Sequence, residues 1–212
     1  MSVSIRRMST FLNLPLHQKL YYLNSFYAEI KTRILYRAIF GYVGEGSWIK
    51  RPRQLCNPRN VTIGKMVRIE ENNTIYSVGN YAGHNYQGLI VIGDKVYANH
   101  TLNITSAEKI VVGDYVAFGP NVFMCDFDHD FSDISKNMIE SELALKGPIH
   151  IGARSWIGAN VFVCGGVTLG EHCVVAANSV VTKSFPPNSV IAGVPAKLIK
   201  YFDLETGEWK RA

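Results

Sequence analysis

An aliphatic residue stands at every sixth position from Ile151 onward. Six successive hexads each begin with Ile, Leu or Val: IGARSW, IGANVF, VCGGVT, LGEHCV, VAANSV and VTKSFP. The same pattern starts upstream at Ile63, Ile92 and Val112. A period of six matches neither an amphipathic helix nor a simple alternating strand, but it matches a short strand and a turn repeated along a coil. The pattern predicts an all-β solenoid with a buried aliphatic column, in which Gly, Asn or Asp supply backbone freedom at the corners.

Two polar, glycine-containing stretches interrupt this rhythm, near residues 77–88 and 126–147. Insertions in a solenoid loop out from a wall without unwinding the column, and loops on a rigid scaffold often carry function. The longer insertion begins with CDFDHDF, which contains a single histidine, His129. We therefore expect a functional site near the start of this insertion.

The first part of the chain follows a different period. Apolar residues recur at intervals of three or four within residues 11–40, as expected for one face of a helix. These are Leu16, Leu20, Leu23, Tyr27, Ile30 and Ile34, with Lys19, Lys31, Arg33 and Arg37 around them. We interpret residues 1–42 as a basic amphipathic helical segment. Two roles remain open, a cap on the solenoid or a contact with an anionic inner membrane leaflet.

Charge and composition limit the number of domains and the cellular location that the chain can have. Of the 212 residues, 47% are apolar, enough for one domain with a substantial core. Residues 1–60 hold ten Lys/Arg and two Asp/Glu, a balance of +8, whereas the remainder balances to −3. No apolar run approaches the roughly 18 residues of a membrane span. Four cysteines without a CxxC pair, and no signal peptide, favour the cytoplasm. We expect no nucleic-acid partner.

The hexads, together with the closing phrase IAGVPAKLIK at 191–200, resemble the hexapeptide-repeat acyltransferases, including the maltose, galactoside and polysaccharide O-acetyltransferases. The resemblance covers residues 43–200 and leaves 201–212 as a C-terminal tail. It implies a left-handed parallel β-helix, acetyl-CoA as acyl donor, a sugar or oligosaccharide acceptor, and a homotrimer with active sites between the β-helices of adjacent chains. No metal is expected.

By the same resemblance, His129 occupies the place of the catalytic histidine, just after the coil VGDYVAFGPNVFM. Imidazole titrates near neutral pH, so it can remove the proton of a sugar hydroxyl that attacks a thioester. The implied activity is an O-acetyltransferase of bacterial surface polysaccharide, such as capsule, O-antigen or exopolysaccharide. An N-acetyltransferase acting on a nucleotide-linked amino sugar would use the same base and donor.

The resemblance also assigns binding residues. Asn99, Asn85 and Trp156 match acceptor-side positions, although Asn99 could instead be a corner residue and Trp156 a packing residue. Ala107 stands where the galactoside enzymes have an acceptor-binding aspartate, which puts their substrate in doubt here. The positions that match the coenzyme A site are Ala159, Ala177, Thr182, Lys183 and Lys200. For the lysines, solvated surface is the alternative to phosphate binding.

Other interpretations involve the neighbours of His129 and the remaining histidines. Asp126, Asp128 and Asp130 either orient the ring or, as we favour, point to solvent, and Cys125 packs in the wall rather than acting as a nucleophile. A γ-type carbonic anhydrase shares the β-helix and holds zinc with three histidines. Its candidates here are His84, His100, His129 and His150. That family spaces two ligands a few residues apart, and His129 lacks such a neighbour. A non-catalytic scaffold would lack His129.

Overall fold

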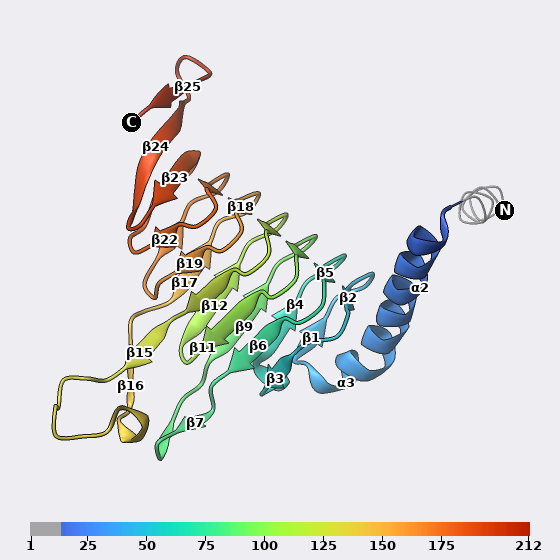
Figure 1. The fold of residues 1–212 in the computed structure, drawn as a ribbon, viewed down its shortest axis with the longest axis horizontal. Coiled ribbons are helices and arrows are strands. Elements are labelled where there is room, and N and C mark those ends of the chain that lie inside the picture. The colour runs from blue at the N-terminus through green and yellow to red at the C-terminus, as the bar shows by residue number, and fades with distance from the viewer. Residues whose placement is uncertain (1–13) are drawn as a thin grey trace.

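The computed structural model describes residues 14–212 and forms a parallel β-helix with a helix lying along its N-terminal end (Figure 1). Each turn of the coil contributes one short strand to each of three sheets, so strands from successive turns pair in parallel. We call these sheets A, B and C, in the order in which the chain passes through them. The prediction of a parallel β-helix is confirmed.

Sheets A and C hold six strands each, and sheet B holds nine. Sheet A contains β1 (Tyr42–Val43), β4 (Val61–Ile63), β9 (Leu89–Ile92), β12 (Lys109–Val112), β17 (Ile149–Ile151) and β20 (Thr168–Leu169). Sheet B contains β2 (Trp48–Ile49), β5 (Arg68–Ile69), β10 (Tyr97–Ala98), β13 (Ala117–Phe118), β18 (Trp156–Ile157), β21 (Val174–Val175), β23 (Ser189–Gly193), β24 (Ala196–Asp203) and β25 (Glu208–Arg211). Sheet C contains β3 (Gln54–Cys56), β6 (Thr74–Ser77), β11 (Asn103–Ser106), β14 (Phe123–Cys125), β19 (Phe162–Val163) and β22 (Val180–Val181).

The aliphatic positions of the hexads form the buried column. In sheet C, for example, Ile104 pairs in register with Ile75 on one side and Met124 on the other, and all three side chains are at most 2% exposed. Stacking therefore removes the whole column from water. Burial of apolar surface stabilises the fold by about 25 cal/mol per Å².

The corners are built differently from what the sequence suggested. Where sheet A passes to sheet B, left-handed backbone is adopted by Lys95, Tyr115 and Arg154, which are neither Gly, Asn nor Asp. The glycines before them are required by close approach. A Cβ on Gly152 would lie 2.3 Å from the carbonyl carbon of Gly170 in the next turn of the coil. Asparagine does take the left-handed positions between sheets B and C, as at Asn160.

The N-terminal helix α2 (Leu16–Lys31) continues through a π-helical turn, Thr32–Tyr36, into α3 (Arg37–Ile39). It packs on the first coil through Ala28 and Thr32, each 1% exposed, and the Thr32 hydroxyl accepts a hydrogen bond of 2.9 Å from the amide of Ile49. The helix thus covers the N-terminal end of the column.

The apolar stripe predicted for this helix does not make that contact. Leu20, Leu23 and Ile34 are 56%, 52% and 72% exposed, and the other members of the stripe are also exposed. Small or hydroxylated side chains pack inward instead: the buried residues of the helix and its π-helical turn are Ala28, Thr32 and Tyr36. Among residues 14–212, no helix has the length and apolar character needed to cross a bilayer. The part of the predicted segment before residue 14 lies outside the described residues.

Two hairpins and a C-terminal arm project from the coil (Figure 1). The first insertion contains β7 (Asn80–Tyr81) and β8 (His84–Asn85), and the second contains β15 (Phe127–His129), a 3-10 turn at Met138–Glu140 and β16 (Leu143–Leu145). β24 runs through the boundary expected at residue 200 and pairs with β25, so the last residues form an antiparallel hairpin. Another 3-10 turn, Pro58–Asn60, precedes β4.

Candidate active site

The two insertions leave the coil at the same edge, where sheet C passes to sheet A, and pack against each other. The rings of Tyr81 and His129 lie 5.3 Å apart, centroid to centroid. The Tyr81 hydroxyl donates to the carbonyl of Ile139 at 3.2 Å, and the amide of Leu143 donates to the hydroxyl of Tyr86 at 2.8 Å. The insertions therefore support each other, although they are distant in sequence.

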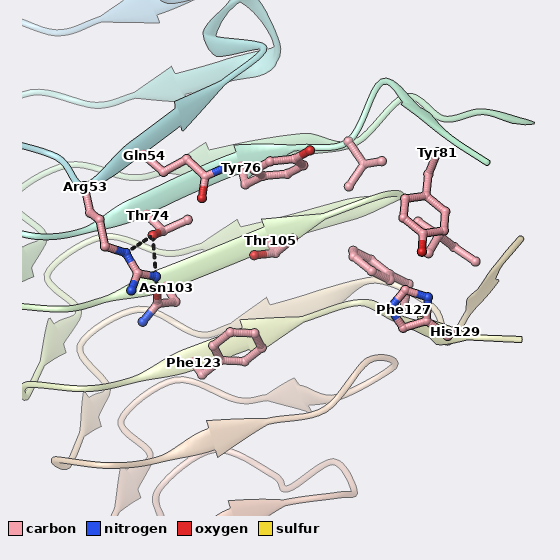
Figure 2. A pocket seen from close by; sticks show the side chains of 12 residues that line it. Arg53, Gln54, Thr74, Tyr76, Tyr81, Asn103, Thr105, Phe123, Phe127 and His129 are labelled. Carbon is pink, nitrogen blue, oxygen red and sulfur yellow. Dashed lines mark hydrogen bonds between the residues drawn. The ribbon is translucent and has the colours of Figure 1, made fainter. Parts of the chain in front are cut away.

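His129 is the last residue of β15 and pairs with Leu143 of β16 in antiparallel register. This pairing fixes its backbone, and the Tyr81 ring lies against one side of its imidazole. The side chain remains exposed, at one end of a groove of about 300 Å³ along the outer surface of sheet C (Figure 2). We call this the sheet C groove. It places the His129 imidazole beside a space that can hold a small ligand.

Asp126 anchors the base of the second insertion. Its carboxylate is fully buried and accepts hydrogen bonds from the Ser106 hydroxyl at 2.6 Å and from the amides of Ala107, Glu108 and Lys109 at 2.7, 3.2 and 2.8 Å. The expectation that Asp126 points to solvent is wrong. Four donors from the preceding turn compensate for the burial of this charge.

The other acidic neighbours do not contact the imidazole. Asp128 is exposed, with its carboxylate 3.6 Å from the Lys146 ammonium. Asp130 accepts a hydrogen bond from the amide of Ser132, which lowers the pKa of its carboxyl. Burial raises the pKa of the Cys125 thiol to about 11, and the thiol donates to the carbonyl of Phe127. A thiol in this state packs in the wall and is a poor nucleophile.

Some of the remaining predicted site residues share the edge that carries His129. Asn85 lies on the first hairpin, and its side-chain oxygen accepts a hydrogen bond from Asn80 at 3.0 Å. Thr182 and Lys183 follow β22 at the same edge, and the Lys183 ammonium lies 5.6 Å from the centre of the Phe185 ring.

The others lie elsewhere on the coil. Asn99, Ala159 and Ala177 lie at the opposite edge of sheet C, one strand length away, where sheet B passes to sheet C. Trp156 projects from sheet B and is 57% exposed, and Lys200 lies in β24. None of these five residues lines the sheet C groove. A single chain therefore does not bring His129 together with Asn99, and the roles of these residues remain predictions.

The groove contains residues that sequence reasoning did not single out. Tyr76 and Phe123 contribute rings to its wall, and Arg53 lies at the end opposite His129 (Figure 2). Tyr76 and Phe123 stand on outward-facing positions of sheet C, and Arg53 directly precedes β3; the hexad rule defines such positions only as non-core. Nothing in their sequence context marks them, because they are assembled by stacking of turns.

Ala107 is buried, with 3% of its surface exposed, and packs with Val78 and Leu143 beneath the two insertions. An acidic side chain would not fit this apolar cluster without a partner. Across residues 14–212, no group of three or more His, Cys, Asp or Glu is placed to hold a metal ion.

Comparison with known proteins agrees with this architecture. Residues 148–183 match the family model described as bacterial transferase hexapeptide (six repeats). The chain is 31% identical to the galactoside O-acetyltransferase of Escherichia coli over 80% of this chain and 68% of that protein. It is 39% identical to the putative lipopolysaccharide biosynthesis O-acetyl transferase WbbJ of Escherichia coli, over 59% of this chain and 67% of that one.

A further relative, a probable acetyltransferase of Mycobacterium tuberculosis, is 33% identical over 75% of this chain, which spans only 49% of that protein's length. Among solved structures, the N-acyltransferase AntD of Bacillus cereus, in complex with dTDP and 3-hydroxybutyryl-CoA, superimposes with a TM-score of 0.68 at 21% identity. The matched region covers 82% of this chain and 90% of AntD.

The fold, the hexads and these relatives define the class: the chain belongs to the bacterial hexapeptide-repeat acyltransferase family. Membership confirms the prediction of an acyltransferase and the left-handed sense of the coil.

Proposed function

We propose that this protein transfers an acetyl group from acetyl-CoA to a sugar hydroxyl during the synthesis of a bacterial surface polysaccharide. The observation that carries the proposal is His129, fixed at the end of the sheet C groove by the β15–β16 pairing and the Tyr81 ring. The names of two relatives, a galactoside O-acetyltransferase and a putative lipopolysaccharide O-acetyl transferase, support a sugar hydroxyl as acceptor.

In this mechanism the imidazole of His129 accepts the proton of the sugar hydroxyl as its oxygen attacks the thioester carbonyl. A C–O bond forms, and the carbonyl electrons move to oxygen, where an amide side chain or a backbone N–H stabilises the charge. Collapse of this intermediate breaks the C–S bond, and the proton on His129 passes to the departing thiolate. Proton transfer by a positioned base contributes about 10²- to 10⁴-fold to such rates.

The geometry supports a site shared between chains. Asn99, Ala159 and Ala177 lie at one edge of sheet C and His129 at the other, so a site that contains both sets would combine residues of two neighbouring chains. We propose a homotrimer in which Asn99 and Trp156 of one chain face the acceptor held near His129 of the next. Ala159, Ala177, Thr182, Lys183 and Lys200 would bind coenzyme A, and Asn85 would contact the acceptor.

We further propose that the exposed face of α2 rests on an anionic membrane surface. Its apolar side chains, such as Leu20, Leu23 and Ile34, point away from the coil, while Lys19, Arg33 and Arg37 carry positive charge beside them. An apolar stripe flanked by basic residues is the arrangement of helices that lie in the plane of a membrane interface. Four free cysteines fit the reducing cytoplasm, where a lipid-linked acceptor would be presented.

The direct test is a mass-spectrometric screen of saccharide acceptors incubated with the protein and acetyl-CoA. We expect one acetyl group to appear on a hydroxyl of the acceptor, with release of free coenzyme A. Matched acceptors that carry an amine in place of one hydroxyl separate this activity from N-acetyl transfer. Faster transfer to the amine would replace the O-acetyl proposal, and no transfer to any saccharide would refute it.

A further inference from the structure

The positively charged side chain of Arg53 lies at the far end of the sheet C groove, where hydrogen bonds orient it. The Arg53 guanidinium donates to the Thr74 hydroxyl from Nε and Nη2, at 3.3 and 3.1 Å, and from Nη2 to the side-chain oxygen of Asn103 at 2.9 Å (Figure 2). Thr74 and Asn103 are direct partners in the parallel register of sheet C. Two adjacent turns of the coil thus aim this side chain along the wall.

The partners of Arg53 are neutral. Within residues 14–212, no carboxylate lies within ion-pair distance of its guanidinium, whereas Lys50 and Arg51 are paired with Glu70 and Glu71. The two hydrogen-bonded partners orient the guanidinium without cancelling its charge. Nη1 makes no hydrogen bond to any other residue that the structure describes, so its two hydrogens can be donated to a carboxylate or a phosphate.

The groove between Arg53 and His129 suits a saccharide. Tyr76 and Phe123 provide rings and Thr105 a hydroxyl along its wall, so both apolar and polar contacts are available. The Tyr76 phenol can donate a hydrogen bond at neutral pH, as an ordinary phenol does, and burial raises its pKa further. From Thr74 to Val78, which packs with Leu143 beside His129, the wall extends about 13 Å at 3.3 Å per residue. An acceptor that reaches both ends is longer than one sugar ring.

We propose that Arg53 binds an anionic group of the acceptor, so that the substrate is an acidic oligosaccharide or a saccharide phosphate rather than a neutral sugar. The reacting hydroxyl lies at His129, and the carboxylate or phosphate lies on a neighbouring unit at the opposite end of the sheet C groove. This inference rests on the proposed function for the position of the acceptor, but the anion subsite itself is testable without acetyl transfer.

The test measures binding of three disaccharide probes of matched size to the full-length protein by calorimetry. Maltose is neutral, maltose 1-phosphate differs from it only by the phosphate, and digalacturonate carries carboxylates. We expect at least one charged probe to bind about tenfold or more tightly than maltose, as a charge-assisted hydrogen bond would give. Arg53→Gln should abolish that preference and leave maltose binding unchanged.

Two variants make the result specific. Arg59→Gln removes the same charge from an exposed arginine of the same coil that does not line the groove, and it should retain the preference. Arg53→Lys keeps the charge but lacks the planar guanidinium that Thr74 and Asn103 orient, and it should retain only part of the preference. The probe that loses affinity in Arg53→Gln identifies the anion as a phosphate or a carboxylate.

Equal binding of all three probes by the unaltered protein, or an unchanged preference in Arg53→Gln, would overturn the inference. These outcomes are distinct from failure of the proposed function. A charged probe that binds through Arg53 but is never acetylated would refute the proposed function and leave the subsite intact. Acetylation of a saccharide by a protein whose preference for the charged probes survives Arg53→Gln would refute the subsite and leave the function.

Discussion

The Tyr81 ring lies against the His129 imidazole, with 5.3 Å between the ring centroids and 55° between the ring planes. The two residues belong to different insertions, which leave different turns of the coil. The catalytic candidate is therefore positioned partly by a hairpin from elsewhere in the chain. An aromatic contact of this kind contributes about 0.5–1.5 kcal/mol.

Replacing Tyr81 should lower acetyl transfer through the position of His129. We expect Tyr81→Ala to reduce kcat/KM up to about tenfold, since 1.36 kcal/mol corresponds to tenfold in rate. Tyr81→Phe keeps the ring and loses only the exposed hydrogen bond to Ile139, so it should remain within about twofold. Steady-state kinetics on the three proteins would check this. Equal rates for Tyr81→Ala and the unaltered protein would contradict the positioning role.

The buried Asp126 carboxylate should stabilise the coil where the second insertion begins. Asp126→Ala leaves the Ser106 hydroxyl and three backbone amides without their acceptor, and we expect the free energy of unfolding to fall by about 3 kcal/mol or more. Asp128→Ala is the matched control. It removes an exposed carboxylate whose pair with Lys146 is solvated, so the change should be within about 0.5 kcal/mol.

Denaturant unfolding of both variants measures this difference. Similar stabilities for Asp126→Ala and Asp128→Ala would show that the four hydrogen bonds do not hold the base of the insertion.

The Cys125 thiol should be unreactive in the folded protein and should not take part in acetyl transfer. A thiol with a pKa of about 11 is ionised in roughly one molecule in ten thousand at pH 7, so reaction with iodoacetamide in the folded protein should be far slower than after unfolding. Cys125→Ala should also retain acetyl transfer within a few-fold. Loss of transfer in this variant, together with fast alkylation of the folded protein, would point to a thiol nucleophile instead.

Sequence periodicity predicts the coil because one physical requirement, an aliphatic side chain at each inward position, is repeated in every turn. It predicts His129 as a candidate because an insertion interrupts that repeat. Arg53 and the hydrogen bonds of Asp126 are not accessible in the same way. Each depends on which residues face one another in adjacent turns, and that register is visible only when the turns are stacked.

The helix illustrates a different limit. An apolar stripe shows that residues such as Leu20 and Leu23 share a face, but not which face meets the coil. In the structure the contact is made by Ala28 and Thr32, whose small side chains and hydroxyl hydrogen bond favour close packing. Similarly, the sequence pattern predicts that glycine supplies backbone freedom at the corners. In the structure, Gly152 is needed because the next turn lies too close to leave room for a Cβ.

Disruption of the exposed α2 face should weaken binding to anionic vesicles. We expect the triple variant Leu20→Glu, Leu23→Glu, Ile34→Glu to lose cosedimentation with phosphatidylglycerol-containing vesicles, because it removes apolar contacts and adds repulsion. Binding of the unaltered protein should fall as salt increases, since exposed charges are screened over about 8 Å at physiological ionic strength. The matched control, with the same charge change at exposed apolar positions away from α2, is Ile134→Glu, Ile139→Glu, Leu204→Glu.

Light scattering on the same proteins distinguishes a membrane face from a subunit interface. The oligomeric state should be unchanged in the α2 triple variant. Dissociation of the oligomer would show that another copy of the chain covers this face. Vesicle binding equal to that of the control variant would show that a lipid surface does not bind it.

The central claim is that His129 of one chain acts together with Asn99 of a neighbour, and a mixing experiment tests it most directly. His129→Ala and Asn99→Ala should each reduce acetyl transfer about 10²-fold or more. When the two variants are unfolded together and refolded as a mixture, about a quarter of the sites between chains should contain both native residues and recover activity.

The measurement is the rate of acetyl transfer by this mixture, with unaltered protein refolded in the same way as control. The account predicts a rate of roughly one quarter of the control, well above either variant alone. A rate for His129→Ala within a few-fold of the unaltered protein, or a mixture no more active than the mean of the two variants, would contradict it.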